Sequence, residues 1–137
     1  MKLTELKPQF LRHEVRIEPG RRVKAGADPL NYTEDDIEEY QGPHDWFIPV
    51  ETLADAHGMH FLCPLCFAKN GGSRGTHMVS VGFAGRAHEA PFCHDGQGKL
   101  VFWNVSGAGF ADLTLTPSIQ CLGGCNWHGF VTNGEVT

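Results

Sequence analysis

The chain has 137 residues, of which 41% are hydrophobic and 20% charged, so its size and composition predict one globular domain over residues 1–137. A net charge of −5 gives no general attraction to nucleic-acid phosphates, and the sequence lacks a long apolar run that could cross a membrane or direct export. We therefore expect neither nucleic acid nor membrane among its partners.

Five cysteines form an odd number, which does not suit a complete disulfide framework. Thiolates stay available for metal in a reducing compartment, so we expect the cytoplasm of a bacterium or of a phage-infected host cell. The 17 glycines and 8 prolines indicate many turns and short strands and disfavour an all-helical fold.

The first third of the chain predicts an extended arm and two short helices. Residues 1–19 are expected to be extended, and residues 21–31 form a polar loop. Residues 33–40 predict a helix, because Thr33-Glu34-Asp35-Asp36 resembles a capping box, and its carboxylates are expected to form a solvated face. Residues 49–56 predict a second helix, with proline at its start and glycine soon after its end.

The remaining elements are predicted strands. Residues 76–83 and 112–116 alternate polar and apolar side chains, residues 99–105 are more continuously apolar, and Pro117 is expected to stop the third strand. Residues 129–136 predict a hairpin with an Asn-Gly turn. The predicted fold class is α+β and β-rich: a small antiparallel sheet with two short helices and a zinc-ribbon-like knuckle.

Two cysteine-containing motifs predict a metal site. Cys63-Pro64-Leu65-Cys66 and Cys125-Asn126-Trp127-His128 together supply three thiolates and one imidazole, a ligand set that tetrahedral Zn²⁺ takes in closed structural sites. The predicted ligands are therefore Cys63, Cys66, Cys125 and His128. Cys121 competes for a place in a four-cysteine site, whereas Cys93 is left out.

Two other interpretations of the Cys-x-x-Cys motif remain. A redox pair would need a βαβ pattern, but residues 68–75 have the composition of a loop. Unligated cysteines could also serve as small buried apolar side chains.

Candidate catalytic residues lie outside the metal ligands, since a zinc ion with four protein ligands has no open position for water. Ser118, after Pro117 at a predicted strand end, is the candidate nucleophile. His60 is the candidate base because it lies three residues before Cys63. A zinc ion bound to the Cys63–Cys66 knuckle would hold it close to the segment that follows Ser118. His77 is an alternative base. Residues 103–110 contain two glycines spaced as in a phosphate loop, but no lysine or helix follows, so they predict a turn.

Four segments carry a resemblance to a known family: residues 1–10, Phe61-Leu62-Cys63-Pro64, residues 113–119 with Leu-Thr-Pro-Ser-Ile, and Cys125-Asn126-Trp127-His128-Gly129-Phe130 with a following Asn-Gly. The chain resembles a small zinc-binding family of prophages and of bacterial ubiquitin-like conjugation operons, whose members look like deubiquitinase-like serine peptidases. The resemblance implies that Ser118 is the family's serine and that Cys63, Cys125 and His128 are metal or active-site positions.

Three functional hypotheses follow. The first is a zinc-stabilised, phage-related serine-type peptidase that acts on ubiquitin-like or peptide substrates. The second is a non-enzymatic zinc-binding interaction or virion-associated protein, in which Ser118 only makes a turn. The third is a metal-dependent hydrolase, which would need water in place of one protein ligand.

Overall fold

The computed structural model describes residues 1–86, 88–122 and 124–137. The chain divides into two compact units: Met1–His13 with Ile48–Thr137 forms unit 1, and Glu14–Phe47 forms unit 2. The prediction of a single domain stays a prediction. Among the described residues, no helix is both long and apolar enough to span a lipid bilayer.

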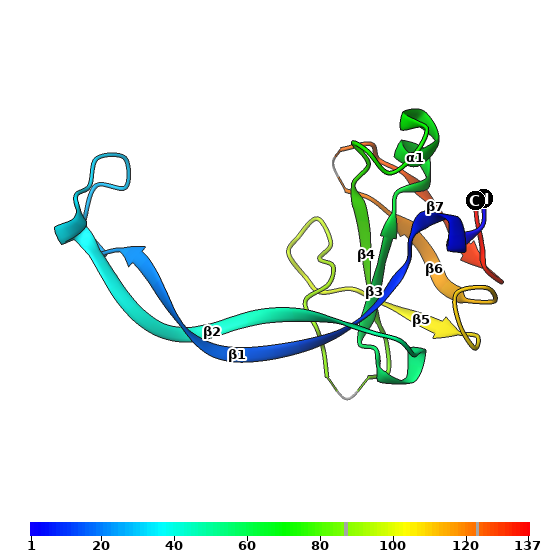
Figure 1. The fold of residues 1–137 in the computed structure, drawn as a ribbon, viewed down its shortest axis with the longest axis horizontal. Coiled ribbons are helices and arrows are strands. Elements are labelled where there is room, and N and C mark those ends of the chain that lie inside the picture. Colours follow the sequence, from blue (N-terminus) through cyan, green and yellow to red (C-terminus); the bar gives the residue numbers. More distant parts are fainter. Residues whose placement is uncertain (87, 123) are drawn as a thin grey trace. The chain divides into compact units, whose positions relative to one another are not determined.

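In the part of the chain that the structure describes, eight strands form one sheet in the order β2-β1-β3-β4-β5-β6-β7-β8 (Figure 1). Every neighbouring pair from β1–β3 onward is antiparallel except β4–β5, which is parallel. The predicted β-rich, mostly antiparallel fold class is thus confirmed. The strands are β1 (Gln9–Val23), β2 (Ile37–Val50), β3 (Gly58–Leu62), β4 (Met78–Phe83), β5 (Phe102–Ser106), β6 (Thr114–Gln120), β7 (His128–Thr132) and β8 (Glu135–Val136).

The helical content is smaller than predicted, and most of it lies elsewhere. The helix predicted at 33–40 is wrong after its first turn, because the 3-10 helix η2 (Glu34–Asp36) passes directly into β2. Cross-strand contacts within unit 2 explain the difference: the Arg22 guanidinium lies 4.7 Å from the Tyr40 ring centroid and donates to Glu38 at 2.8 Å. Such contacts between strands outweigh the weak helix propensity of residues 33–40.

The helix predicted at 49–56 is likewise reduced to the 3-10 helix η3 (Leu53–Asp55). Thr52 caps this turn, since its hydroxyl accepts the Asp55 N–H at 3.3 Å. A further 3-10 helix, η1 (Leu3–Leu6), lies at the start of the chain.

The α-helix α1 (Pro64–Asn70) belongs to the cysteine knuckle, part of which was predicted to be loop. Pro64 occupies the first helical turn, where its missing N–H costs no hydrogen bond. Gly71 ends the helix with a positive φ of 69°, a conformation that glycine adopts without steric penalty.

Pro117 does not stop β6, contrary to the sequence-based prediction. Pro117 is paired with neither neighbouring strand. Residues 114–116 of β6 pair with β5, and the register between β6 and β7 shifts between Leu115 and Ile119. A proline without an N–H is tolerated at such an irregular position. The strand therefore continues through Ser118.

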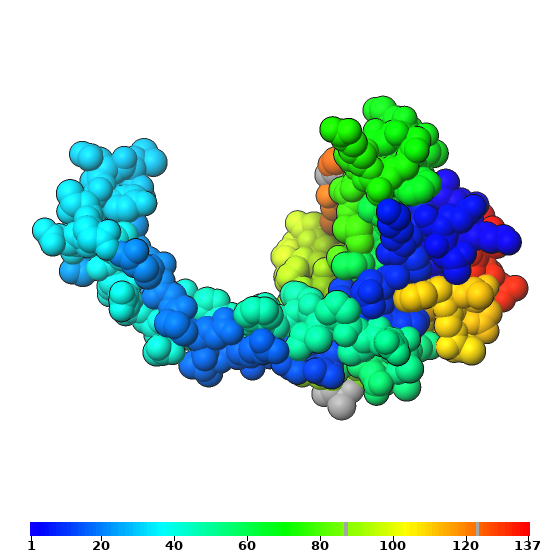
Figure 2. Space-filling model, viewed as in Figure 1, coloured from blue at the N-terminus to red at the C-terminus, as the bar shows by residue number. Residues whose placement is uncertain are grey.

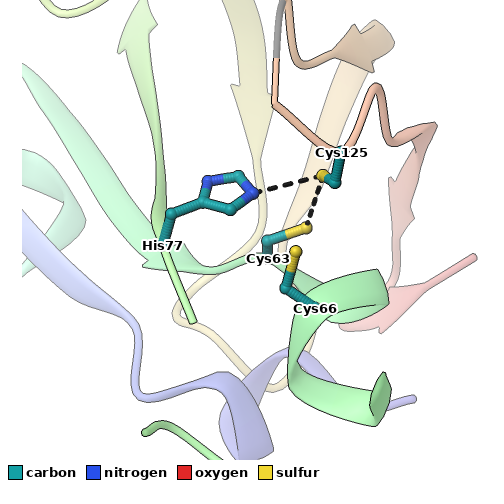
Figure 3. A group of neighbouring side chains, drawn as sticks. All are labelled: Cys63, Cys66, His77 and Cys125. Carbon is teal, nitrogen blue, oxygen red and sulfur yellow. Dashed lines mark hydrogen bonds between the residues drawn. The ribbon is translucent and has the colours of Figure 1, made fainter. Parts of the chain in front are cut away.

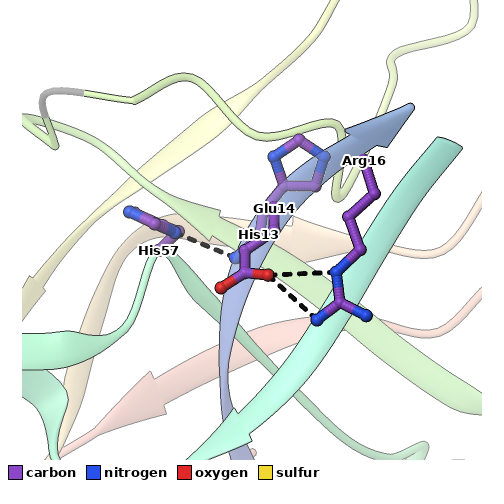
Figure 4. A network of polar contacts seen from close by, with 4 residues as sticks. All are labelled: His13, Glu14, Arg16 and His57. Carbon is purple, nitrogen blue, oxygen red and sulfur yellow. Dashed lines mark hydrogen bonds and ion pairs between the residues drawn. The ribbon is translucent and has the colours of Figure 1, made fainter. Parts of the chain in front are cut away.

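The hydrophobic core lies entirely in unit 1. Alternating strand positions such as Val81, Leu115 and Val131 are at most 1% exposed, and η1 adds Leu3 and Leu6. The two chain ends lie side by side in Figure 2, because the Leu3 N–H donates to the Gly134 carbonyl at 2.8 Å. Within the same unit, the His13 N–H donates to His57 Nδ1 at 2.9 Å (Figure 4).

Unit 2 is a hairpin that stabilises itself through arginine contacts. Arg16 lies 4.5 Å from the Trp46 ring centroid and donates to the Glu14 carboxylate at 3.0 Å (Figure 4). Unit 2 holds nine of the chain's 16 carboxylates and four of its 11 lysines and arginines, so the net charge of −5 belongs to this unit.

Candidate metal centre and active site

Three cysteines and one histidine in unit 1 form a group that could bind a metal ion. The ligand atoms of Cys63, Cys66, His77 and Cys125 all lie within 4.8 Å of one another (Figure 3). Cys63 Sγ is 3.5 Å from Cys125 Sγ, which in turn is 3.2 Å from His77 Nε2. Tetrahedral bonds of about 2.3 Å place two sulfur ligands about 3.8 Å apart, so this spacing fits a zinc-sized ion.

The knuckle and the neighbouring hairpin bring three of these residues together. Cys63 precedes α1 and Cys66 lies in its first turn. The antiparallel register that pairs Leu62 with Met78 continues by one residue, so that the Cys63 N–H donates to the His77 carbonyl at 2.9 Å. Strand pairing therefore places His77 beside Cys63.

Cys125 reaches the group on the loop between β6 and β7. The Cys121 N–H donates to the Trp127 carbonyl at 2.8 Å, which closes this loop. The buried Trp127 ring packs edge-on against Phe61, with centroids 6.2 Å apart, and anchors the loop in the core. Cys125 is thereby held opposite the knuckle.

Electrostatics make this group receptive to a cation. The hydrogen bond from His77 lowers the pKa of Cys125 to about 6, and the same contact raises the pKa of His77. Burial, followed by the neighbouring Cys125 and Cys63 thiols, raises the pKa of Cys66 to about 11. A divalent cation bound here would offset the raised pKa of Cys66, because a metal stabilises the thiolate form of its ligands.

The other cysteines lie outside this group of four. Burial raises the pKa of Cys121 to about 12, with further contributions from Cys63 and Cys125. Cys93 donates to the His94 carbonyl at 3.7 Å, and burial raises its pKa. Neither residue takes the place of a ligand in the group.

Ser118 and His128 form a second pair of reactive groups on adjacent strands. Ser118 Oγ lies 2.9 Å from His128 Nε2. The β6–β7 register pairs Gln120 with His128, so Ser118 and His128 are diagonal neighbours on one face of the sheet. The Trp103 indole N–H donates to the Ser118 carbonyl at 3.1 Å and fixes the backbone at this position.

The structure thus brings together Cys63, Cys66 and Cys125 from the predicted metal set, but it places His128 against Ser118. His60, the predicted base, is not brought to Ser118: it lies on β3, and β4 and β5 stand between β3 and β6 in the sheet. Burial lowers the pKa of His60. The imidazole in contact with Ser118 is that of His128.

His77 is the member of this group that spacing rules overlooked as a candidate ligand. It has no cysteine or histidine neighbour at two-residue spacing, the pattern on which the predicted ligand set rested. The available signal was the strand predicted at 76–83, since an antiparallel partner of the segment before Cys63 begins beside that cysteine if the two strands pair along their full length.

The model of the BubE family, described as "Bacterial ubiquitination-like system serine protease (BubE)", matches residues 34–137. The chain belongs to the BubE family. Neither the curated proteins nor the solved structures include a significant match. The resemblance to a peptidase family of ubiquitin-like conjugation systems is confirmed.

The BubE match contains both candidate sites. All four residues of the metal-binding group, together with Ser118 and His128, fall within residues 34–137. Residues 1–33, which include all of β1, lie outside the matched region. The BubE family is one of serine proteases, so proteins are the substrate class that membership implies.

Proposed function

We propose that this chain is a serine peptidase acting on ubiquitin-like or other peptide substrates, with Ser118 as nucleophile and His128 as general base. The single observation that carries the proposal is the 2.9 Å contact between Ser118 Oγ and His128 Nε2. This distance is within reach for proton transfer between a hydroxyl and an imidazole. A serine protease family needs such a pair, and this one lies inside the matched region.

In the first half of the proposed reaction, His128 takes up one proton and then releases it. His128 Nε2 accepts the Ser118 hydroxyl proton as Oγ attacks the substrate carbonyl carbon, which gives a tetrahedral intermediate. The protonated imidazole then donates this proton to the leaving amine as the peptide bond breaks. Water, deprotonated by the same imidazole, then attacks the acyl-enzyme carbonyl. The imidazolium returns this proton to Ser118 Oγ as the ester bond breaks, which releases the carboxylate product and restores the enzyme.

We further propose that Cys63, Cys66, His77 and Cys125 bind Zn²⁺. Three thiolates and one imidazole form a closed tetrahedral set, in which zinc supplies folding free energy and no position remains for a reacting water. These four residues would then hold the catalytic groups in place without taking part in the reaction themselves. Cys125 lies in the loop that leads into β7, three residues before His128, so fixing Cys125 also fixes the approach of His128 to Ser118.

The ligand chemistry also supports a reducing location. Thiolates in a disulfide-forming compartment would be lost to oxidation, so we propose that the protein acts in the cytoplasm.

The test is hydrolysis of a ubiquitin-like protein fused at its C-terminus to a short peptide. Ser118→Ala and His128→Gln are each expected to lower kcat about 10³-fold or more, since both members of a nucleophile–base pair are needed. The control is Ser106→Ala, on β5, which is expected to retain the wild-type rate.

Circular dichroism melting separates lost chemistry from lost folding. Both active-site variants are expected to melt close to the wild type, because Ser118 is only half-buried and His128 is exposed. Turnover by Ser118→Ala at the wild-type rate would exclude this nucleophile.

A further inference from the structure

We propose that the hollow beside Ser118 is a subsite for a large apolar side chain of the substrate residue next to the cleaved bond; this rests on the proposed function for the identity of that bond. The hollow has a volume of about 600 Å³. Its wall is formed by the loop before β5, by β5 itself, by Ser118 and its neighbours on β6, and by the loop after β6. Its apolar members include Leu100, Val101, Phe102, Trp103 and Leu122.

The wall of this hollow combines Asp95 and Lys99 with several partly exposed apolar side chains. Leu122 is 58% exposed, and Leu100, Val101 and Phe102 are each only half-buried. Exposed leucine surface gains about 25 cal/mol for each Å² that a ligand covers. An apolar side chain seated here would cover several such surfaces at once.

The loop of residues 93–101 gives the hollow a preformed wall. The Asp95 carboxylate accepts the N–H groups of Gln97 at 2.8 Å and Lys99 at 3.0 Å, and the Val101 N–H donates to the Cys93 carbonyl at 3.0 Å. These bonds hold the loop without a ligand, so binding carries little cost for ordering it.

Trp103 links the hollow to the reactive hydroxyl. Its ring lines the hollow, while its indole N–H donates to the Ser118 carbonyl at 3.1 Å. A side chain that packs on Trp103 therefore lies close to the backbone of Ser118. This is the geometry expected of a specificity pocket adjacent to a nucleophile.

The chemistry of the wall selects against charge. The Asp95 carboxylate already accepts two backbone N–H groups, which lower its pKa. Lys99 also lines the hollow, but its side chain is exposed, so solvent screens its attraction for a carboxylate. A carboxylate or ammonium group among Leu100, Phe102 and Leu122 would lose hydration without gaining hydrogen bonds from them. The favoured substrate residue is therefore leucine, isoleucine, methionine or phenylalanine.

The first experiment measures cleavage of internally quenched octapeptides in which one position next to the bond is leucine, phenylalanine, glycine, aspartate or lysine. Wild-type kcat/KM is expected to be about tenfold or more higher for leucine and phenylalanine than for the others. Leu122→Asp should remove this preference. Leu30→Asp, at an exposed leucine of unit 2, should retain it.

The second experiment measures binding without turnover, so that this inference and the proposed peptidase activity can fail separately. N-acetyl-leucinamide is titrated into Ser118→Ala protein, and the indole N–H resonances are followed by NMR. The Trp103 resonance is expected to shift, while that of Trp46, in unit 2, stays unchanged. N-acetyl-glycinamide, or the added Leu122→Asp change, should abolish the shift.

A Trp103 shift in a protein that cleaves no peptide would leave the apolar subsite standing and contradict the peptidase. Equal cleavage of all five peptides, or equal Trp103 shifts with the leucine and glycine amides, would overturn the subsite.

Discussion

The Cys125 loop is the point where the metal-binding group and the serine–histidine pair meet. Cys125 contacts the Cys63 thiol at 3.5 Å, and three residues later His128 contacts Ser118 at 2.9 Å. A short loop held at both positions has few alternative conformations, so the two sites are expected to depend on each other. Single substitutions can therefore test the metal-binding group and the serine–histidine pair one at a time.

Metal content distinguishes the two candidate histidine ligands. His77→Ala is expected to lose most of the zinc bound after expression in defined medium, because His77 Nε2 lies among the three thiols. His128→Ala, its matched control, should keep one zinc per chain. Elemental analysis of the purified variants measures both values, and the opposite result would restore the ligand set predicted from spacing.

Asp112 shows how a charged residue can stabilise a turn. Residues 103–106 of the turn predicted at 103–110 belong to β5, and the turn itself follows that strand. There the Asp112 carboxylate accepts the N–H groups of Ala108 at 2.9 Å and Gly109 at 3.0 Å, so the turn binds the chain's own carboxylate. These bonds, with Gly109 contributing most, lower the pKa of Asp112. A lowered native pKa contributes stability above the unfolded value of 3.8, and this contribution is lost as the pH falls through the native pKa.

Asp112→Asn is therefore expected to unfold at lower urea concentration than the wild type at pH 7. The difference should shrink when the pH is lowered below 3.8 toward the native pKa of Asp112. Asp28→Asn, which keeps one acceptor for the Leu30 N–H in unit 2, serves as the control. A constant difference across this range would mean that carboxylate ionisation contributes nothing.

At the scale of elements, the features that could be predicted from sequence are those fixed by local chemistry. The β7–β8 hairpin follows from Asn133-Gly134, whose φ angles of 47° and 77° are the positive pair of a type I′ turn. The knuckle cysteines follow from their two-residue spacing. Both features require only residues close together in the chain.

Features that depend on distant pairing could not be predicted from local patterns. The acidic segment after Thr33 matches a helix start, yet β2 forms because Glu38 and Tyr40 contact Arg22 on β1. His77 is placed by the β3–β4 register, and His128 by the β6–β7 register. Register depends on which strands pair, and a single sequence specifies that only weakly.

Gly134→Ala tests how tightly the hairpin turn is fixed. A Cβ at Gly134 would lie 2.1 Å from the Ala111 carbonyl oxygen, in addition to the positive φ. We expect a loss of about 2 kcal/mol or more in the free energy of unfolding, since the backbone strain alone costs about 1–2 kcal/mol. Urea denaturation measures this loss.

Gly98→Ala is the matched control for the hairpin variant. Gly98 also has a positive φ, of 80°, but a Cβ there would meet no atom within 4 Å. Its cost should be limited to backbone strain. Equal losses in the two variants would show that close packing against Ala111 is unimportant.

At the scale of the whole molecule, fold and chemistry are concentrated in unit 1. The buried core, the metal-binding group and the Ser118–His128 pair all come from residues 1–13 and 48–137. Unit 2 contributes no residue to this core cluster, although it carries the net charge. Unit 1 should therefore fold and bind metal by itself. If the chain were a single cooperative domain, both units would be needed for folding and metal binding.

Replacing residues 14–47 by an Asn-Gly turn tests this expectation. The shortened chain should melt cooperatively, retain one zinc and cleave the fusion substrate, because every group assigned to these properties remains. A melting temperature within about 4 °C of the full chain would correspond to a loss below about 1 kcal/mol. Replacing only the loop of residues 24–33 in the same way is the control for the new connection. Loss of zinc and of cooperative melting in the first variant alone would show that the hairpin is part of one domain spanning all 137 residues.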